Sequence, residues 1–82
     1  MRTVWKFPLN FGMTEIEVGA DARVVHVGLD PQDAPRVWVE HTHPGPRTTM
    51  RLSMVGTGYP VEGTHVGTFF DGPFVWHVYK LP

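Results

Sequence analysis

The sequence predicts a small all-β protein, and three of its features support this expectation. Nine glycines and eight prolines divide the 82 residues into short segments. The segments are rich in Val, Trp, Phe, Tyr and Thr, which are the residue types that favour strands. No segment carries the sustained i, i+3, i+4 apolar repeat of a long amphipathic helix. We therefore expect about seven short antiparallel strands in a meander that closes into a small barrel or sandwich.

Each expected strand is bounded by turn residues. The second one alternates most clearly, since Ile16 and Val18 would share one face and Glu15 and Glu17 the other. The turn signals in chain order are Pro8 with Asn10–Gly12, Gly19–Asp21, Pro31 with Pro35, Pro44-Gly45-Pro46, Gly56-Thr57-Gly58 and Asp71-Gly72. The last of these is typical of a type I′ hairpin, which needs positive φ at both central residues. The expected strands are Thr3–Phe7, Glu15–Val18, Arg23–Leu29, Arg36–Thr42, Thr48–Val55, His65–Phe70 and Phe74–Lys80.

The fourth and fifth expected strands are the pair whose register the pattern predicts. In both, apolar and polar positions alternate, so that each would bury one stripe: Val37, Val39 and His41 in the fourth, and Met50, Leu52 and Met54 in the fifth. Pairing Glu40 with Arg51 places Val39 opposite Leu52. A slip of one residue would set apolar against polar side chains throughout. We therefore expect these two strands to be neighbours in one sheet.

The last expected strand is apolar on both faces. Phe74, Trp76 and Val78 would lie on one side, and Val75, His77 and Tyr79 on the other. A strand of this kind is either central and covered twice, or it meets another subunit. We expect a homo-oligomer that associates through Phe74–Tyr79.

Composition narrows the class of protein. Eight acidic residues against seven basic ones argue against a partner such as duplex nucleic acid. The chain has no cysteine, and no apolar run approaches the length of a membrane span. The N-terminus lacks the order of a signal peptide. We expect one domain over residues 1–82, cytoplasmic and without a membrane.

No sequence pattern of a catalytic site is present. There is no Ser-centred elbow, and Gly56-Thr57-Gly58 lacks the lysine and the helix that a phosphate loop needs. We therefore expect no enzyme and no cofactor.

A histidine pair leaves one alternative to this expectation open. His41 and His43 lie two apart on an expected strand and would point to the same side, a spacing that can chelate a metal. A third ligand would have to come from His26, His65 or Glu40, and the sequence completes no tetrahedral set. The ordinary interpretation is a strand running into a loop, with one histidine half-buried and one exposed. A metal-dependent enzyme is the third-ranked hypothesis.

One polar stripe is the candidate ligand site. Arg47, Thr49, Arg51 and Ser53 would share a face, with Trp38 alongside on the neighbouring strand. Guanidinium and hydroxyl groups match phosphate, and an indole offers a stacking platform for a base. The stripe therefore fits a small anionic or nucleotide-like ligand. The alternative is a solvated sheet face with an ion pair.

The chain also resembles a family of small uncharacterised proteins found mainly in bacteriophages and prophages. The resemblance rests on these segments, which cover nearly the whole length in order: Val4-Trp5-Lys6-Phe7, Ala22–Gly28, Val37-Trp38-Val39-Glu40, Val55–Pro60, His65–Phe69 and Gly72–Tyr79. It implies a phage setting and a short β-rich fold, and it supplies no catalytic residues.

Two functions follow as hypotheses. The first is a non-enzymatic phage accessory protein that binds a small ligand in the cytoplasm of the infected cell, in its sharpest form by sequestering a nucleotide immune signal. The second is a protein–protein interaction module that docks onto a host or virion protein through the apolar face of the last strand.

Overall fold

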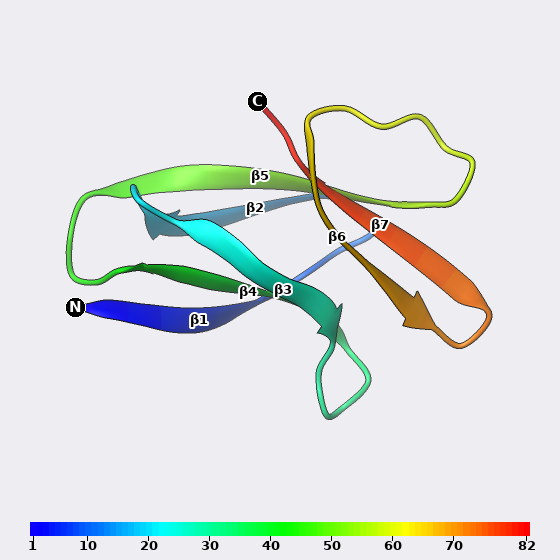
Figure 1. The fold of residues 1–82 in the computed structure, drawn as a ribbon, viewed down its shortest axis with the longest axis horizontal. Helices are drawn as coiled ribbons and strands as arrows, with labels where there is room; N and C mark the ends of the chain where they lie inside the picture. Colours follow the sequence, from blue (N-terminus) through cyan, green and yellow to red (C-terminus); the bar gives the residue numbers. More distant parts are fainter.

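The chain forms seven strands and no helix. A computed structural model describes residues 1–82, and Figure 1 shows its fold. Every expected strand is present, and the second is the most extended relative to its prediction. No helix could cross a membrane, by length or by hydropathy. The strands are β1 (Arg2–Pro8), β2 (Gly12–Gly19), β3 (Arg23–Leu29), β4 (Pro35–Thr42), β5 (Arg47–Gly56), β6 (Thr64–Asp71) and β7 (Phe74–Lys80).

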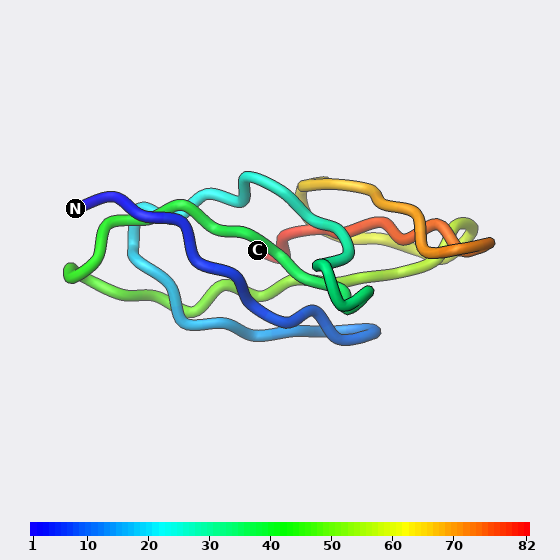
Figure 2. Tube along the Cα trace, turned by 90° about the horizontal axis from the view of Figure 1, so that it is seen from below, coloured from blue at the N-terminus to red at the C-terminus, as the bar shows by residue number.

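The seven strands form two antiparallel sheets that stack face to face. One sheet has the order β1-β4-β3 and the other the order β2-β5-β7-β6. The molecule is flat, with extents of 39 × 29 × 15 Å, and Figure 2 shows the two layers from the side. The all-β expectation is confirmed in its sandwich form. The strand order is not that of a meander, because only β3–β4 and β6–β7 pair with the next strand in the chain.

The predicted pairing of the fourth and fifth strands is wrong. β4 lies between β1 and β3, whereas β5 lies between β2 and β7 in the other sheet. Glu40 accordingly forms ion pairs with Arg2 and Arg23, and Arg51 lies opposite Glu15. Alternation determines which face of a strand is buried, but it does not say which strand is its neighbour. Both apolar stripes belong to the one core that lies between the sheets.

The core is formed by these stripes and a few further side chains. Its fully buried members include Val39, Leu52 and Val78, one or more from each sheet. A buried aliphatic side chain of this size contributes about 1.5–3 kcal/mol relative to exposure. The buried apolar residues are Leu9, Ile16, Val18, Val27, Val37, Val39, Met50, Leu52, Met54, Phe69 and Val78.

A buried carboxylate fixes the loop between β3 and β4. Asp30 Oδ1 accepts hydrogen bonds from the backbone N–H groups of Gln32 and Ala34, at 2.8 and 3.1 Å. Its Oδ2 accepts one from Arg36 Nε at 2.8 Å. These bonds, the one from Arg36 first, lower the pKa of Asp30 from 3.8 to about 2. The aspartate therefore organises a turn, which is the role expected of this residue type beside proline.

Candidate functional site

The structure does not bring Trp38 to the polar stripe of β5. Trp38 lies on the outer face of the three-stranded sheet, 5.2 Å from the ring of His26. Arg47, Thr49, Arg51 and Ser53 lie along β5 in the other sheet. The prediction that Trp38 stands beside them depended on pairing β4 with β5. The stripe itself is present, with its indole platform on the opposite side of the sandwich.

On the outer face of the sheet, the stripe is ordered by β2. Thr49 Oγ1 donates to Glu17 Oε1 at 2.6 Å, and Arg47 Nη2 donates to the Glu17 carbonyl at 3.0 Å. Glu15 lies directly opposite Arg51. An anion on this face would meet two carboxylates, which lowers its affinity for the arginines.

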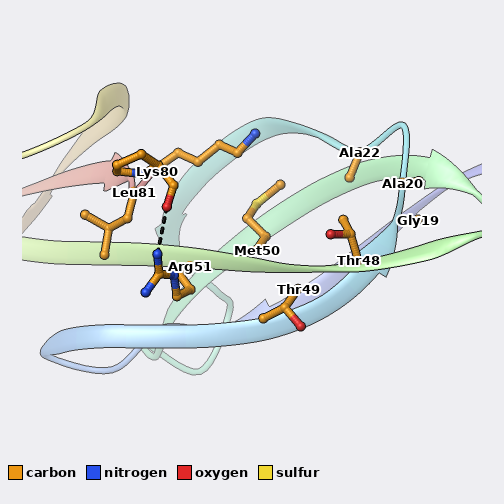
Figure 3. Close-up of a pocket in the computed structure, with 10 residues that line it drawn as sticks. Gly19, Ala20, Ala22, Thr48, Thr49, Met50, Arg51, Lys80 and Leu81 are labelled. Carbon is orange, nitrogen blue, oxygen red and sulfur yellow. Dashed lines mark hydrogen bonds between the residues drawn. The ribbon is translucent and has the colours of Figure 1, made fainter.

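At the edge of β5 the surroundings differ, because a hollow of about 260 Å³ opens there (Figure 3). β7 pairs with β5 only from Leu52 onward, so the first half of β5 has a sheet neighbour on one side only. We call this hollow the edge slot. Its lining consists of Gly19, Ala20 and Ala22, then Thr48, Thr49, Met50 and Arg51, and finally Lys80, Leu81 and Pro82. Two of the predicted site residues, Thr49 and Arg51, therefore line the same hollow as Lys80.

The histidine pair is held in a way that opposes metal binding. His41 is fully buried, and its Nδ1 accepts a hydrogen bond from the Gly19 N–H at 2.7 Å. The ring proton of neutral His41 must therefore be on Nε2, so that this nitrogen has no lone pair for a metal. His43 is exposed, and its ring centre lies 6.2 Å from that of His41. The predicted half-buried histidine is thus completely buried.

Trp5 lies against both histidines. Its ring centre is 4.6 Å from that of His41 in a T-shaped contact and 4.4 Å from that of His43. Nε2 of His41 has no hydrogen-bond partner. A T-shaped contact is the geometry of an N–H···π interaction, which would compensate part of that loss. Burial, followed by the charges of His43 and Arg47, lowers the pKa of His41 below its ordinary value of 6.5.

We expect the stability of the protein to fall as the pH drops below about 6.5. In that range the unfolded chain binds a proton on His41 more readily than the folded protein does, because folding lowers the pKa of His41, so protons favour unfolding. The melting temperature should decrease from pH 7.5 to pH 5.5, and the decrease should shrink in His41→Gln. His65→Gln, at an exposed position, is the control and should retain the full decrease. Equal pH profiles for His41→Gln and the wild type would contradict the assignment.

A second surface, at the other end of β5 and β7, is aromatic. Trp76 lies 4.9 Å from Phe11 and 5.8 Å from Phe74, measured between ring centres. Tyr59 lines a hollow of about 400 Å³ with Phe74 and Trp76. Phe11, Tyr59 and Phe74 are 68%, 70% and 57% exposed. We call these four residues the aromatic end.

The aromatic end exists because the two sheets are offset. Figure 2 shows the β6–β7 hairpin reaching beyond the strands of the three-stranded sheet. The side of β7 that carries Val78 in the core is therefore only partly covered at Trp76 and is exposed at Phe74. The sequence predicted an apolar face on this strand. It did not predict that Phe11 and Tyr59, which come from loops, join this face. The only sequence feature that could have indicated them is an aromatic residue within a turn segment.

A protein-family comparison covers the whole chain. The family described as "Domain of unknown function (DUF7352)" matches residues 1–82. The chain belongs to this family. No curated protein and no solved structure matches the DUF7352 chain.

Proposed function

We propose that this DUF7352 protein is a non-enzymatic interaction module that docks onto another protein through the aromatic end. One observation carries the proposal: Tyr59, Phe74 and Trp76 line a single open hollow, Phe11 packs against Trp76, and three of these four aromatic side chains are more than half exposed. Exposed aromatic clusters of this kind mark protein interfaces, where Trp and Tyr supply a large share of the binding energy.

The chemistry of the hollow favours a protein surface over a charged small molecule. None of its lining residues is charged. The only polar side chains in the lining are those of Thr57, Tyr59 and Trp76, and Nε1 of Trp76 is buried without a hydrogen-bond partner. Because that nitrogen is buried, it offers no donor to a docked molecule, and the hollow therefore suits a partner with an apolar anchor.

The biological setting belongs to the same proposal. The resemblance to phage and prophage proteins supports a host or virion protein as the partner, met in the cytoplasm of an infected cell. A second copy of the chain is the other protein able to dock, because the aromatic end includes the start of the Phe74–Tyr79 strand.

A small-ligand function is a second proposal with weaker support. The observation in its favour is that Arg51, Thr49 and Lys80 line the edge slot. A nucleotide immune signal would find its phosphate partners there, but Trp38 is too far away to stack on its base. A thermal-shift panel of cyclic and linear nucleotides tests this proposal. A rise in melting temperature at high excess would support it, and the absence of any rise would end it.

Affinity capture with three forms of the protein tests the leading proposal. The bait is the tagged wild-type protein in host lysate, to which untagged chain is added. We expect this bait to retain a specific protein, and we expect the Phe74→Ala bait to lose it. Phe70→Ala is the matched control, because Phe70 is also exposed on the same hairpin, at 74% against 57% for Phe74, but points to the outer face of the sheet. Loss with Phe74→Ala should exceed about tenfold, in the range of an aromatic hot spot. Equal retention by all three baits would overturn the proposal.

A further inference from the structure

We propose that the edge slot is a second binding site, independent of the aromatic end, where an extended acidic peptide of a partner protein adds to the four-stranded sheet as a strand. Three features of the slot support this: the free backbone of β5, the shape of the hollow and the distribution of charge.

The backbone of β5 is available for pairing along the slot. The carbonyl of Arg51 accepts a hydrogen bond at 2.9 Å from the N–H of Leu81, the residue after β7. This carbonyl therefore points toward the β7 side of β5 and away from β2. Backbone groups of alternate residues in a strand point the same way. The N–H and C=O groups of Thr49 and Arg47 are therefore directed to the same side, where β7 no longer runs alongside. An unpaired edge of this kind is a template for an incoming strand.

The hollow has the shape that a strand requires. Four successive residues, from Thr48 to Arg51, line it. Since neighbouring residues point to opposite faces, a hollow that touches all four lies along the edge of the strand. It adjoins a second hollow of about 350 Å³, with which it shares Ala22, Met50 and Lys80. The small side chains of Ala20 and Ala22 leave room between the sheets at this position (Figure 3).

The charges identify the partner as acidic. Of the seven lysines and arginines, Arg2, Lys6, Arg23 and Arg36 form ion pairs with carboxylates. The three without a side-chain carboxylate partner, Arg47, Arg51 and Lys80, all lie at or beside the slot. Arg47 and Arg51 each donate one hydrogen bond to a backbone oxygen, of Glu17 at 3.0 Å and of Pro82 at 2.7 Å. No aspartate or glutamate lines either hollow.

A second copy of β5 fits the slot poorly. Two-fold antiparallel pairing centred on Thr49 would place Arg47 of one copy opposite Arg51 of the other, and like charges in that position destabilise a sheet. A segment that alternates acidic and apolar residues meets both sides of the slot. Its acids would face Arg51 on the outer side, where Glu15 on β2 weakens the attraction without cancelling it, and its apolar residues would face Met50 and Ala22 on the other side.

Fluorescence anisotropy with a labelled Glu-Val-Glu-Val-Glu peptide tests the proposal on the full chain. We expect saturable binding that weakens with salt, while Lys-Val-Lys-Val-Lys does not bind. Glu-Val-Pro-Val-Glu, which lacks the central N–H, should bind at least about tenfold more weakly. Arg51→Gln and Lys80→Gln should each weaken binding about tenfold. Phe74→Ala should leave it unchanged, which separates this site from the aromatic end.

A backbone variant gives the sharpest test. Thr49→Pro removes an N–H on the free side of β5 and keeps the pairing with β2, a position where a sheet tolerates proline. It should abolish binding of the acidic peptide. Equal affinity for the acidic and proline-containing peptides would show that no strand is added. The same comparison of peptides tests strand addition on the wild-type protein if Thr49→Pro does not fold. Equal affinity for the acidic and basic peptides, or displacement of the acidic peptide by an equal concentration of ATP, would overturn the choice of partner.

Discussion

Replacing Leu52 with alanine is expected to lower the free energy of unfolding by about 2–5 kcal/mol. Leu52 is fully buried on β5, which is paired with β2 on one side and β7 on the other. Its side chain belongs to the core shared by the two sheets, so the cavity would open there. A domain of this size buries a small core, and its total stability is of the order of 5–15 kcal/mol. The variant should therefore lose a large part of its stability.

Urea unfolding followed by tryptophan fluorescence measures this loss. Val4→Ala is the control, because Val4 is half exposed on the outer face of β1, and its loss should stay below about 1 kcal/mol. Similar midpoints for Leu52→Ala and Val4→Ala would mean that Leu52 does not lie between the sheets.

The second large effect is expected at Gly63. This residue has φ of +86°, and a Cβ added to it would collide with the backbone carbonyl of Lys80. Gly58, in the same loop, has φ of +98° but nothing within 4 Å of an added Cβ. Gly58→Ala therefore isolates the conformational cost, about 1–2 kcal/mol. Gly63→Ala adds a backbone collision and should cost about 2 kcal/mol more.

Thermal and urea unfolding of the two glycine variants provide the comparison. Equal losses would show that the end of the loop does not rest on β7. The loop matters for both proposed surfaces, because it carries Tyr59 to the aromatic end and meets Lys80 beside the edge slot. Gly63→Ala should accordingly weaken binding of the acidic peptide more than Gly58→Ala does.

The strands and their buried faces were predictable because they depend on local chemistry. Proline and glycine interrupt the chain at every turn, and alternation placed Val39 and Leu52 in the core correctly. The pairing was not predictable in the same way, since the loop after Thr42 is short enough for a hairpin and yet crosses between sheets. No local sequence feature distinguishes a hairpin from a crossover at this loop. The predicted position of Trp38 beside β5 was wrong for that reason.

Contacts between segments that are far apart in the chain could not be predicted from the sequence either. The spacing of His41 and His43 is compatible with a metal site, and only the contact with the Gly19 N–H shows where the proton on His41 must lie. Phe11 and Tyr59 come from separate loops, and their meeting with Trp76 depends on the offset of the sheets. The sequence predicts that the polar residues of β5 share one face of a sheet. It does not predict that the first half of β5 lacks a neighbour on one side, which places the cations of the stripe beside a free strand edge.

The two proposed surfaces lie at opposite ends of β5 and β7. From Thr49 to Gly56 a strand extends about 23 Å, at roughly 3.3 Å per residue. Partners at the aromatic end and at the edge slot therefore approach the molecule from different sides. This arrangement suits a small adapter that brings two proteins together, and it requires no catalytic group.

Hydroxyl-radical footprinting of the aromatic side chains tests the docking role of the aromatic end most directly. The protein is labelled alone and together with the partner that affinity capture retains. We expect Phe11, Tyr59 and Phe74 to react readily in the free protein and to become protected in the complex, while Phe70 stays reactive in both. Unchanged labelling of the first three residues in the complex, or protection of Phe70 instead, would contradict the proposed interface.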